Sequence, residues 1–430
     1  MNLLDHLKKI FINNETKRVS KNFGSLLVLQ GANFILPLIT LPYLVRVLGT
    51  ELFGLVMFAQ AFVLFFNVFV DFGFNLSVTR EISINRDDKN SLSQIFYSVF
   101  FIKILLIIIS IIVISLIVYF VPRFNSDPEI YLLSFGIVIG QALFPVWFFQ
   151  GIEKMSVITT INILAKVIFT ILIFLLVKKE ADYLLVPVFN SIGFIIAGFV
   201  GLFYAMKEIK FVIPKKQRII TLFKDSSQLF VSNLSVTLYT TTNTIILGIF
   251  TNNTMVGVYA SMEKLVLAVK NLYTPLFQAI FPWISKKKTN EIIKIVLKLI
   301  LPILIFGIFI FLIIFIFSNF ILKVIYDNEL ITNYSNVFRI LGLIAIFSGL
   351  NMLFNMVFLS ALKKYKLRMK IVLSAGIINI ILALIFVRYF NIYGIAITVT
   401  FTELLLLIFG WYYFNKIKNE ENSYSTNSCS

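Results

Sequence analysis

Long apolar runs are the feature that most constrains how this chain can fold. They recur along the 430 residues, as in the stretch 92–120, and short polar or basic breaks separate them. A helix crosses the hydrocarbon core with about 20 residues, whereas barrel strands would be about 10 residues long and would alternate. The charged fraction is only 14%, against about 25% in soluble domains. The sequence therefore predicts an all-α integral membrane protein.

About twelve spans are expected from these runs. Their predicted ranges are 23–46, 52–76, 92–120, 131–150, 155–177, 182–206, 227–250, 254–282, 293–318, 335–360, 368–388 and 391–414.

The net charge is strongly positive, at +17. The distribution of the charged residues tells whether this charge indicates nucleic-acid binding or membrane topology. Most Lys and Arg residues fall in alternate breaks between spans, as expected for cytoplasmic loops, so topology explains the charge better than nucleic-acid binding does. No signal peptide is apparent before the first run. The sequence predicts a multi-pass protein with both termini in the cytoplasm.

The longest inner break comes at the middle of the chain and divides it into two six-helix lobes. The predicted organisation is a cytoplasmic leader (1–22), an N-terminal lobe (23–206), a cytoplasmic linker (207–226), a C-terminal lobe (227–414) and a polar cytoplasmic tail (415–430).

A polar stripe interrupts the phenylalanine-rich second span. Gln60, Asn67 and Asp71 fall within about 40° of one another on a helix that turns about 100° per residue. Asp71 lies close to the cytoplasmic end of the span, where it could instead reach the interface or pair with Arg80. We expect Gln60 and Asn67 to face a hydrated cavity and Asp71 with Arg80 to form a cytoplasmic gate.

A weak internal repeat gives that stripe a counterpart in the second half. When Gly54 is aligned with Gly257, the three polar positions of the stripe fall on three residues that also share one helix face. Such a correspondence is typical of transporters with duplicated halves. These residues are Glu263, Lys270 and Thr274, with Lys264 and Asn271 beside them.

Other charged residues lie deep within predicted spans, where facing lipid would cost about 2.5 to 3.5 kcal/mol on insertion scales. Lys103, Lys166 and Glu403 are therefore expected to face the protein interior, with helix–helix pairing as the alternative for the two lysines. Arg46 and Arg339, near outer helix ends, are candidates for the outer mouth, although snorkelling anchors are the simpler interpretation.

The deep lysines outnumber the deep glutamates, so the predicted cavity is positive. Lysine attracts phosphate as a point charge, and amide and hydroxyl groups can exchange hydrogen bonds with sugars. An anionic, hydroxyl-rich ligand is expected, held by Lys103, Lys166, Lys264 and Lys270 with Gln60, Asn67 and Asn271. Glu263 and Glu403 are candidates for coupling or gating. The single Cys and the single His, both in polar terminal segments, make a metal site or cofactor unexpected.

Three stretches resemble one known family. "LPYLVRVLGTELFGLVMFAQAF" (41–62), "DFGFNLSVTREIS" (71–83) and "NIYGIAITVTFTE" (391–403) are similar to the Wzx-type flippases of O-antigen and related polysaccharide repeat units. The resemblance covers nearly the whole chain. It implies the multidrug, oligosaccharidyl-lipid and polysaccharide (MOP) exporter superfamily, with two six-helix bundles related by a pseudo-two-fold axis.

The resemblance also implies a substrate and a location. The substrate would be an undecaprenyl-pyrophosphate-linked oligosaccharide, moved from the cytoplasmic to the periplasmic leaflet of the bacterial inner membrane by alternating access. Ion-gradient coupling and contact with polysaccharide polymerase and chain-length machinery are further expectations.

Two other functions compete with this one. A multidrug exporter of the same superfamily would favour an acidic, aromatic cavity, which the lysine excess argues against. A membrane glycan polymerase or transferase would need a sizeable catalytic portion outside the membrane, and the sequence offers none. The chain is therefore expected to be a transporter rather than an enzyme.

Overall fold

The fold was analysed in a computed structural model that describes residues 14–427. The predicted leader and tail are thus described only in part: residues 1–13, with His6, and residues 428–430, with Cys429, lie outside the described residues. No strand occurs between residues 14 and 427, and nearly all of this part of the chain is helical.

Two compact units divide the described chain, and each is treated separately. Unit 1 comprises the described residues up to Thr40 together with Phe62–Leu234. Unit 2 comprises Leu41–Ala61 together with the described residues from Ser235 onward. The unit boundaries therefore fall within two long helices, α2 (Asn14–Asp71) and α10 (Lys216–Phe250), which pass from one unit to the other.

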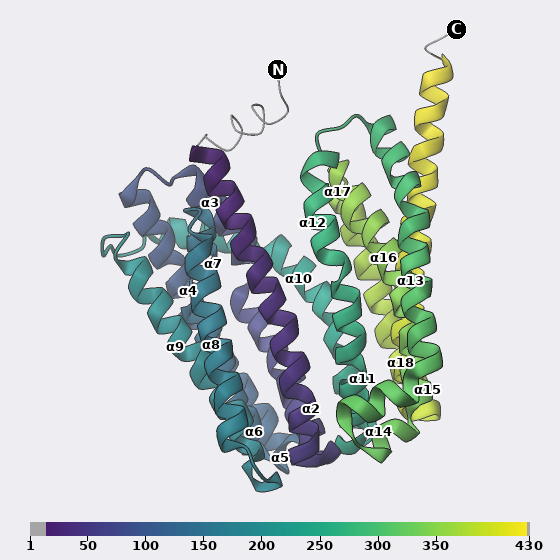
Figure 1. The fold of residues 1–430 in the computed structure, drawn as a ribbon. Coiled ribbons are helices and arrows are strands. Elements are labelled where there is room, and N and C mark those ends of the chain that lie inside the picture. Colours follow the sequence, from purple (N-terminus) through teal and green to yellow (C-terminus); the bar gives the residue numbers. More distant parts are fainter. Residues whose placement is uncertain (1–13, 428–430) are drawn as a thin grey trace. The chain divides into compact units, whose positions relative to one another are not determined.

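Unit 1 is built mainly from helices that follow α2 (Figure 1). They are α3 (Phe74–Ile84), α4 (Lys89–Phe120), α5 (Pro122–Asn125), α6 (Pro128–Leu143), α7 (Val146–Gly151), α8 (Met155–Leu176), the 3-10 helix η1 (Glu180–Leu184) and α9 (Leu185–Met206).

Unit 2 holds the remaining helices after α10 (Figure 1). They are α11 (Asn253–Asn271), α12 (Tyr273–Ile284), α13 (Thr289–Tyr326), α14 (Glu329–Asn333), α15 (Ser335–Gly342), α16 (Ile344–Asn351), the π-helix η2 (Met352–Phe358), α17 (Leu359–Ala361) and α18 (Tyr365–Asn427).

Eight helical stretches among the described residues are long and apolar enough to cross a membrane. Two of them, Gln30–Ile84 and Tyr365–Glu421, each cover two predicted spans, and non-helical backbone at Gly49 and Asn391 marks the break. The predicted spans 227–250 and 254–282 correspond to α10 and to α11 with α12, which are not among these eight stretches. The predicted all-α membrane fold is confirmed.

The opening of α4 illustrates how local sequence sets a helix end. Asp88 precedes the helix, and its carboxylate accepts hydrogen bonds from the backbone N–H groups of Asn90 and Ser91 at 2.9 and 3.3 Å. A hydrogen bond from the Ser91 hydroxyl lowers the pKa of the Asp88 carboxyl below its usual range. An ionised Asp88 also suits the positive end of the helix dipole.

The turn between α2 and α3 has an unusual backbone. Phe72 and Gly73 both have positive φ angles, 46° and 79°, which a phenylalanine rarely adopts. The Phe72 ring stacks between Phe223 and Phe230 of α10, with centroid distances of 4.3 and 4.7 Å. This aromatic stack holds the turn that follows Asp71 within unit 1.

Gly54 of α2 and Gly257 of α11 lie backbone to backbone within unit 2. A Cβ on Gly54 would be 1.8 Å from the Asn253 oxygen, and a Cβ on Gly257 would be 2.0 Å from the Thr50 oxygen. Small residues spaced four apart on both helices allow this approach, as at other close helix crossings in membranes. The two glycines that the repeat alignment paired thus contact each other reciprocally.

Candidate functional site

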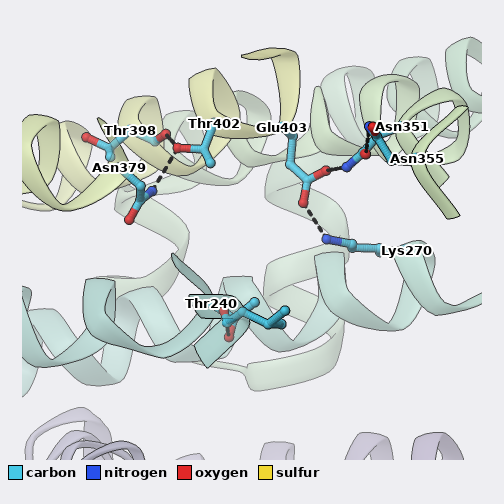
Figure 2. Close-up of polar contacts among 9 residues, drawn as sticks. Thr240, Lys270, Asn351, Asn355, Asn379, Thr398, Thr402 and Glu403 are labelled. Atoms are coloured by element: carbon cyan, nitrogen blue, oxygen red, sulfur yellow. Dashed lines mark hydrogen bonds and ion pairs between the residues drawn. The ribbon is translucent and has the colours of Figure 1, made fainter. Parts of the chain in front are cut away.

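Glu403 of α18 forms the centre of a buried polar network in unit 2 (Figure 2). Its Oε1 pairs with the ammonium of Lys270 from α11, and its Oε2 accepts a hydrogen bond from Asn351 Nδ2 at 2.8 Å. Three helices far apart in the sequence thereby converge on one carboxylate. Both Glu403 oxygens therefore have a polar partner, as a buried carboxylate requires.

Asn355, four residues after Asn351, completes this network. Its Nδ2 donates to Asn351 Oδ1 and to the Leu406 carbonyl, each at 2.8 Å. Asn355 lies on the π-helix η2, and Asn351 is the residue immediately before it. π-helical segments are rare and often occur at functional sites because they re-aim side chains.

The two members of the ion pair are unequally accessible. The side chain of Lys270 is 20% exposed, whereas that of Glu403 is 5% exposed. An incoming anion would therefore reach the ammonium of Lys270 more easily than a cation would reach Glu403.

A second polar group adjoins this network on α18. Asn379 Nδ2 donates to Thr402 Oγ1 at 2.8 Å, and the Thr402 hydroxyl donates to the Thr398 carbonyl at 2.8 Å (Figure 2). Sequence reasoning did not single out Asn379, although a lone amide in the apolar stretch 371–388 was a usable signal.

Glu263 and Lys264, two further sequence candidates on α11, are separate from the network. The Tyr259 hydroxyl donates to Glu263 Oε1 at 3.1 Å. Lys264 is half-buried and forms no ion pair among the residues the structure describes. Asn271, the last residue of α11, is also half-buried.

In unit 1 the nearest cation to Asp71 corrects one expectation. The Asp71 carboxylate lies 3.6 Å from the Lys103 ammonium of α4, whereas Arg80 of α3 is exposed and is not this partner. Lys103 has a side chain only 4% exposed. The sequence could not choose between the two cations, because helical phase does not tell which neighbouring helix a side chain meets.

Lys166 of α8 has a different environment. Its ammonium donates to Asn33 Oδ1 of α2 at 2.5 Å, and no acidic side chain of the described residues pairs with it. Unit 1 therefore contains a half-buried cation with an amide partner. Of the predicted polar stripe, Asn67 lies half-buried in the same unit, whereas Gln60 belongs to unit 2.

Arg46 and Arg339, the two arginines predicted near outer helix ends, bind backbone carbonyls within unit 2. Arg46 donates to the carbonyls of Val324, Ile325 and Tyr326 at 3.1, 2.8 and 3.3 Å, at the negative end of the α13 dipole. Arg339 donates to the Phe315 carbonyl and the Ser318 hydroxyl of the same helix. Both side chains therefore hold α13 in place.

Replacing Asp71 with asparagine is expected to destabilise the protein strongly, because the buried Lys103 ammonium would lose its counter-ion. Breaking one partner of a buried pair costs about 3 to 5 kcal/mol. The measurement is the thermal unfolding midpoint in detergent. The matched control is Asp87→Asn, which removes an exposed carboxylate between α3 and α4. Asp71→Asn with Lys103→Met should recover much of the loss, and equal midpoints for Asp71→Asn and Asp87→Asn would refute the pairing.

Comparison with family models decides the membership of this chain. Residues 19–288 match the family described as "Polysaccharide biosynthesis protein". The chain belongs to that family. A protein of Escherichia coli (strain K12) named "Putative O-antigen transporter" is 31% identical over 405 residues, covering 92% of this chain and 96% of the relative. A protein of the same name from Shigella dysenteriae is 27% identical, covering 91% and 98%.

Solved structures of MOP exporters share the fold of this chain. An inward-facing multidrug resistance MATE transporter has a TM-score of 0.65 at 13% identity, covering 89% of this chain and 96% of that one. The lipid II flippase MurJ, in an inward closed conformation, has a TM-score of 0.64 at 16% identity, covering 90% and 87%. The expected relation to polysaccharide transporters is confirmed, as is a transporter rather than an enzyme, and the fold is the one found in MOP exporters.

Proposed function

We propose that the chain is a flippase for oligosaccharide repeat units of the O-antigen type, carried on undecaprenyl pyrophosphate. The support is threefold: two relatives named as O-antigen transporters, the fold shared with a lipid II flippase, and buried lysines suited to a pyrophosphate. The proposed location is the bacterial inner membrane, with both termini in the cytoplasm, in keeping with the distribution of Lys and Arg.

The observation that carries the proposal is the Lys270–Glu403 pair. Glu403 neutralises Lys270 and makes its burial tolerable. A pyrophosphate carries more negative charge than one carboxylate. It can therefore displace Glu403 from the more accessible Lys270 ammonium. The Lys270 ammonium therefore binds the pyrophosphate, and the Glu403 carboxylate pairs with this ammonium until the substrate arrives.

Exchange of partners on Lys270 offers a route to coupling. Once Lys270 turns to the substrate, Glu403 is left with Asn351 as a neutral partner and little access to water. This change of partner at Glu403 is the step that we propose couples translocation to an ion gradient.

Other cations have supporting roles in this proposal. Lys166 of unit 1, whose ammonium donates to the Asn33 amide, and Lys264 of unit 2, which lies beside Glu263, would each attract an anionic head group. Lys103 is held by Asp71 and is better suited to positioning than to binding. Gln60, Asn67 and Asn271 would exchange hydrogen bonds with sugar hydroxyls.

Transport follows alternating access, in which the protein exposes Lys270 first to the cytoplasmic and then to the periplasmic side. The predicted six-helix lobes, 23–206 and 227–414, are the proposed moving parts, and the polyprenyl tail stays in lipid throughout. The polymerase and chain-length machinery would receive the flipped unit. Multidrug export stays the weaker alternative, because drug cations would be repelled by unpaired lysines such as Lys166.

A translocation assay tests this proposal. The purified protein is reconstituted in vesicles whose two leaflets both contain undecaprenyl-pyrophosphate-linked oligosaccharide, and a membrane-impermeant glycosidase is added outside. With an active flippase, nearly all of the lipid-linked sugar should become cleavable, whereas protein-free vesicles should protect the inner half. Protection of the inner half in vesicles with folded protein, under an imposed proton gradient of either sign, would overturn the proposal.

A further inference from the structure

The connection between α9 and α10 (207–215), taken together with the first residue of α10, Lys216, exposes apolar side chains to an unusual degree. Ile213 is 80% exposed and Phe211 is 78% exposed, the two highest values for large apolar side chains in the described part of the chain. Neither residue lies in a helix, so neither belongs to a lipid-facing span. We call this stretch the α9–α10 connection.

Side chains at the start of α4 hold this connection in a fixed shape. The amide of Gln94 bridges it, donating to the Ile213 carbonyl and accepting from the Lys215 N–H, both at 3.1 Å. The hydroxyl of Ser93 accepts from the Lys210 N–H at 3.0 Å. The outward direction of the apolar side chains is therefore built into the fold and is not an accident of a loose loop.

Charge in the same stretch is positive and unneutralised. Lys210, Lys215 and Lys216 are exposed and form no ion pair with any described acidic residue. The acids nearby already have partners: Glu208 pairs with Lys154 and Glu81 pairs with Arg218, at 2.5 and 2.6 Å. The connection therefore combines exposed apolar groups with a surplus of lysine.

Its depth relative to the membrane follows from α4. The first strongly exposed apolar side chain within this helix is Phe101, at 51%, and the lipid-facing surface continues from there. At about 1.5 Å per residue, Tyr97 lies roughly 6 Å before Phe101, within the headgroup layer of about 5 to 8 Å. The ring of Phe211 packs edge-on against Tyr97 at 5.2 Å. Phe211 therefore lies at the level of the lipid headgroups.

We propose that the α9–α10 connection is a binding surface for anionic phospholipids. Lys210, Lys215 and Lys216 contact the headgroup phosphates, while Phe211 and Ile213 insert between the headgroups, towards the acyl chains. Lysine beside apolar side chains at interfacial depth is the combination that anionic membrane surfaces attract. This surface is separate from Lys270 and Glu403 and does not depend on the transported substrate.

A lipid-dependent stability measurement tests the charge component. Phosphatidylglycerol added to the detergent-solubilised protein should raise the unfolding midpoint more than phosphatidylcholine does. The variant Lys210→Gln/Lys215→Gln/Lys216→Gln should lose at least half of that difference. The matched control, Lys363→Gln/Lys364→Gln/Lys366→Gln, removes three exposed lysines from another turn and should keep it. Equal loss in both triple variants, or loss in neither, would overturn the proposal.

A depth measurement tests the apolar component without any change of charge at the lysines. A nitroxide is attached to Ile213→Cys in a chain that also carries Cys429→Ser, since Cys429 is the single cysteine. In vesicles containing phosphatidylglycerol, the label should be more accessible to oxygen than to a water-soluble nickel complex, relative to a label at Lys288→Cys. Equal, water-like accessibility at both positions would refute insertion.

Discussion

Lys270→Gln should abolish transport, reducing surface polysaccharide at least tenfold in a strain that relies on this chain as its flippase. It removes the proposed anion ligand and leaves the Glu403 carboxylate, only 5% exposed, without its cation. An uncompensated buried charge costs about 3 to 5 kcal/mol, so the amount of folded protein in the membrane should fall as well. Both quantities are measured, polymer by gel and protein by quantitative immunoblot.

Lys270→Gln/Glu403→Gln separates the two effects. Replacing both partners by neutral amides removes the unpaired charge, so membrane abundance should recover towards that of the native protein. Transport should stay absent, because the pyrophosphate has lost its ammonium. Polymer at the native level in the double variant would show that the pair is structural only.

Gly54→Ala is expected to destabilise the protein strongly. Its Cβ would lie 1.8 Å from the Asn253 carbonyl oxygen and 2.6 Å from the Gly257 nitrogen, which are backbone atoms that cannot rotate away. Overpacking of a tight contact typically costs about 1 to 3 kcal/mol, and a backbone clash on this scale should reach or exceed the top of that range. The measurement is the unfolding midpoint of the purified protein, together with its yield in membranes.

Gly31→Ala is the matched control on the same helix, since a Cβ there meets nothing within 4 Å. That variant should be as stable as the native protein or slightly more stable, because alanine favours helix. Similar behaviour of the Gly54 and Gly31 variants would contradict the close crossing of α2 and α11.

The sequence predicted the helical fold well because its signal is local. Length and apolarity of the runs suffice to mark spans, and glycine or asparagine punctuates the breaks at Gly49 and Asn391. The alignment of Gly54 with Gly257 also pointed to a pair of positions that the fold brings into contact.

Partners of the charged residues were harder to predict, because pairing depends on how helices distant in sequence are aligned. Lys270 and Glu403 were each recognised as deep charges, yet their pairing joins residues 133 positions apart. For Asp71 the sequence suggested Arg80, which is close along the chain, and the packing of α4 supplied Lys103 instead.

Irregular backbone was beyond the sequence analysis altogether. The π-helix η2 has wider turns than an α-helix, which shifts the helical phase. A projection at 100° per residue therefore gives the wrong direction for Asn355 relative to the residues before η2. The role of Arg46 could not be predicted either. Its partners at the end of α13 are backbone carbonyls, which every residue has and which the sequence therefore does not mark.

If this protein flips a pyrophosphate-linked oligosaccharide by binding it through Lys270, translocation must depend on that side chain. The most direct measurement is the vesicle translocation assay, run on the native protein beside the folded Lys270→Gln/Glu403→Gln variant. The native protein should expose nearly all of the lipid-linked sugar to the external glycosidase, while the double variant should leave the inner half protected. Equal exposure by both proteins, or protection by both, would contradict this mechanism.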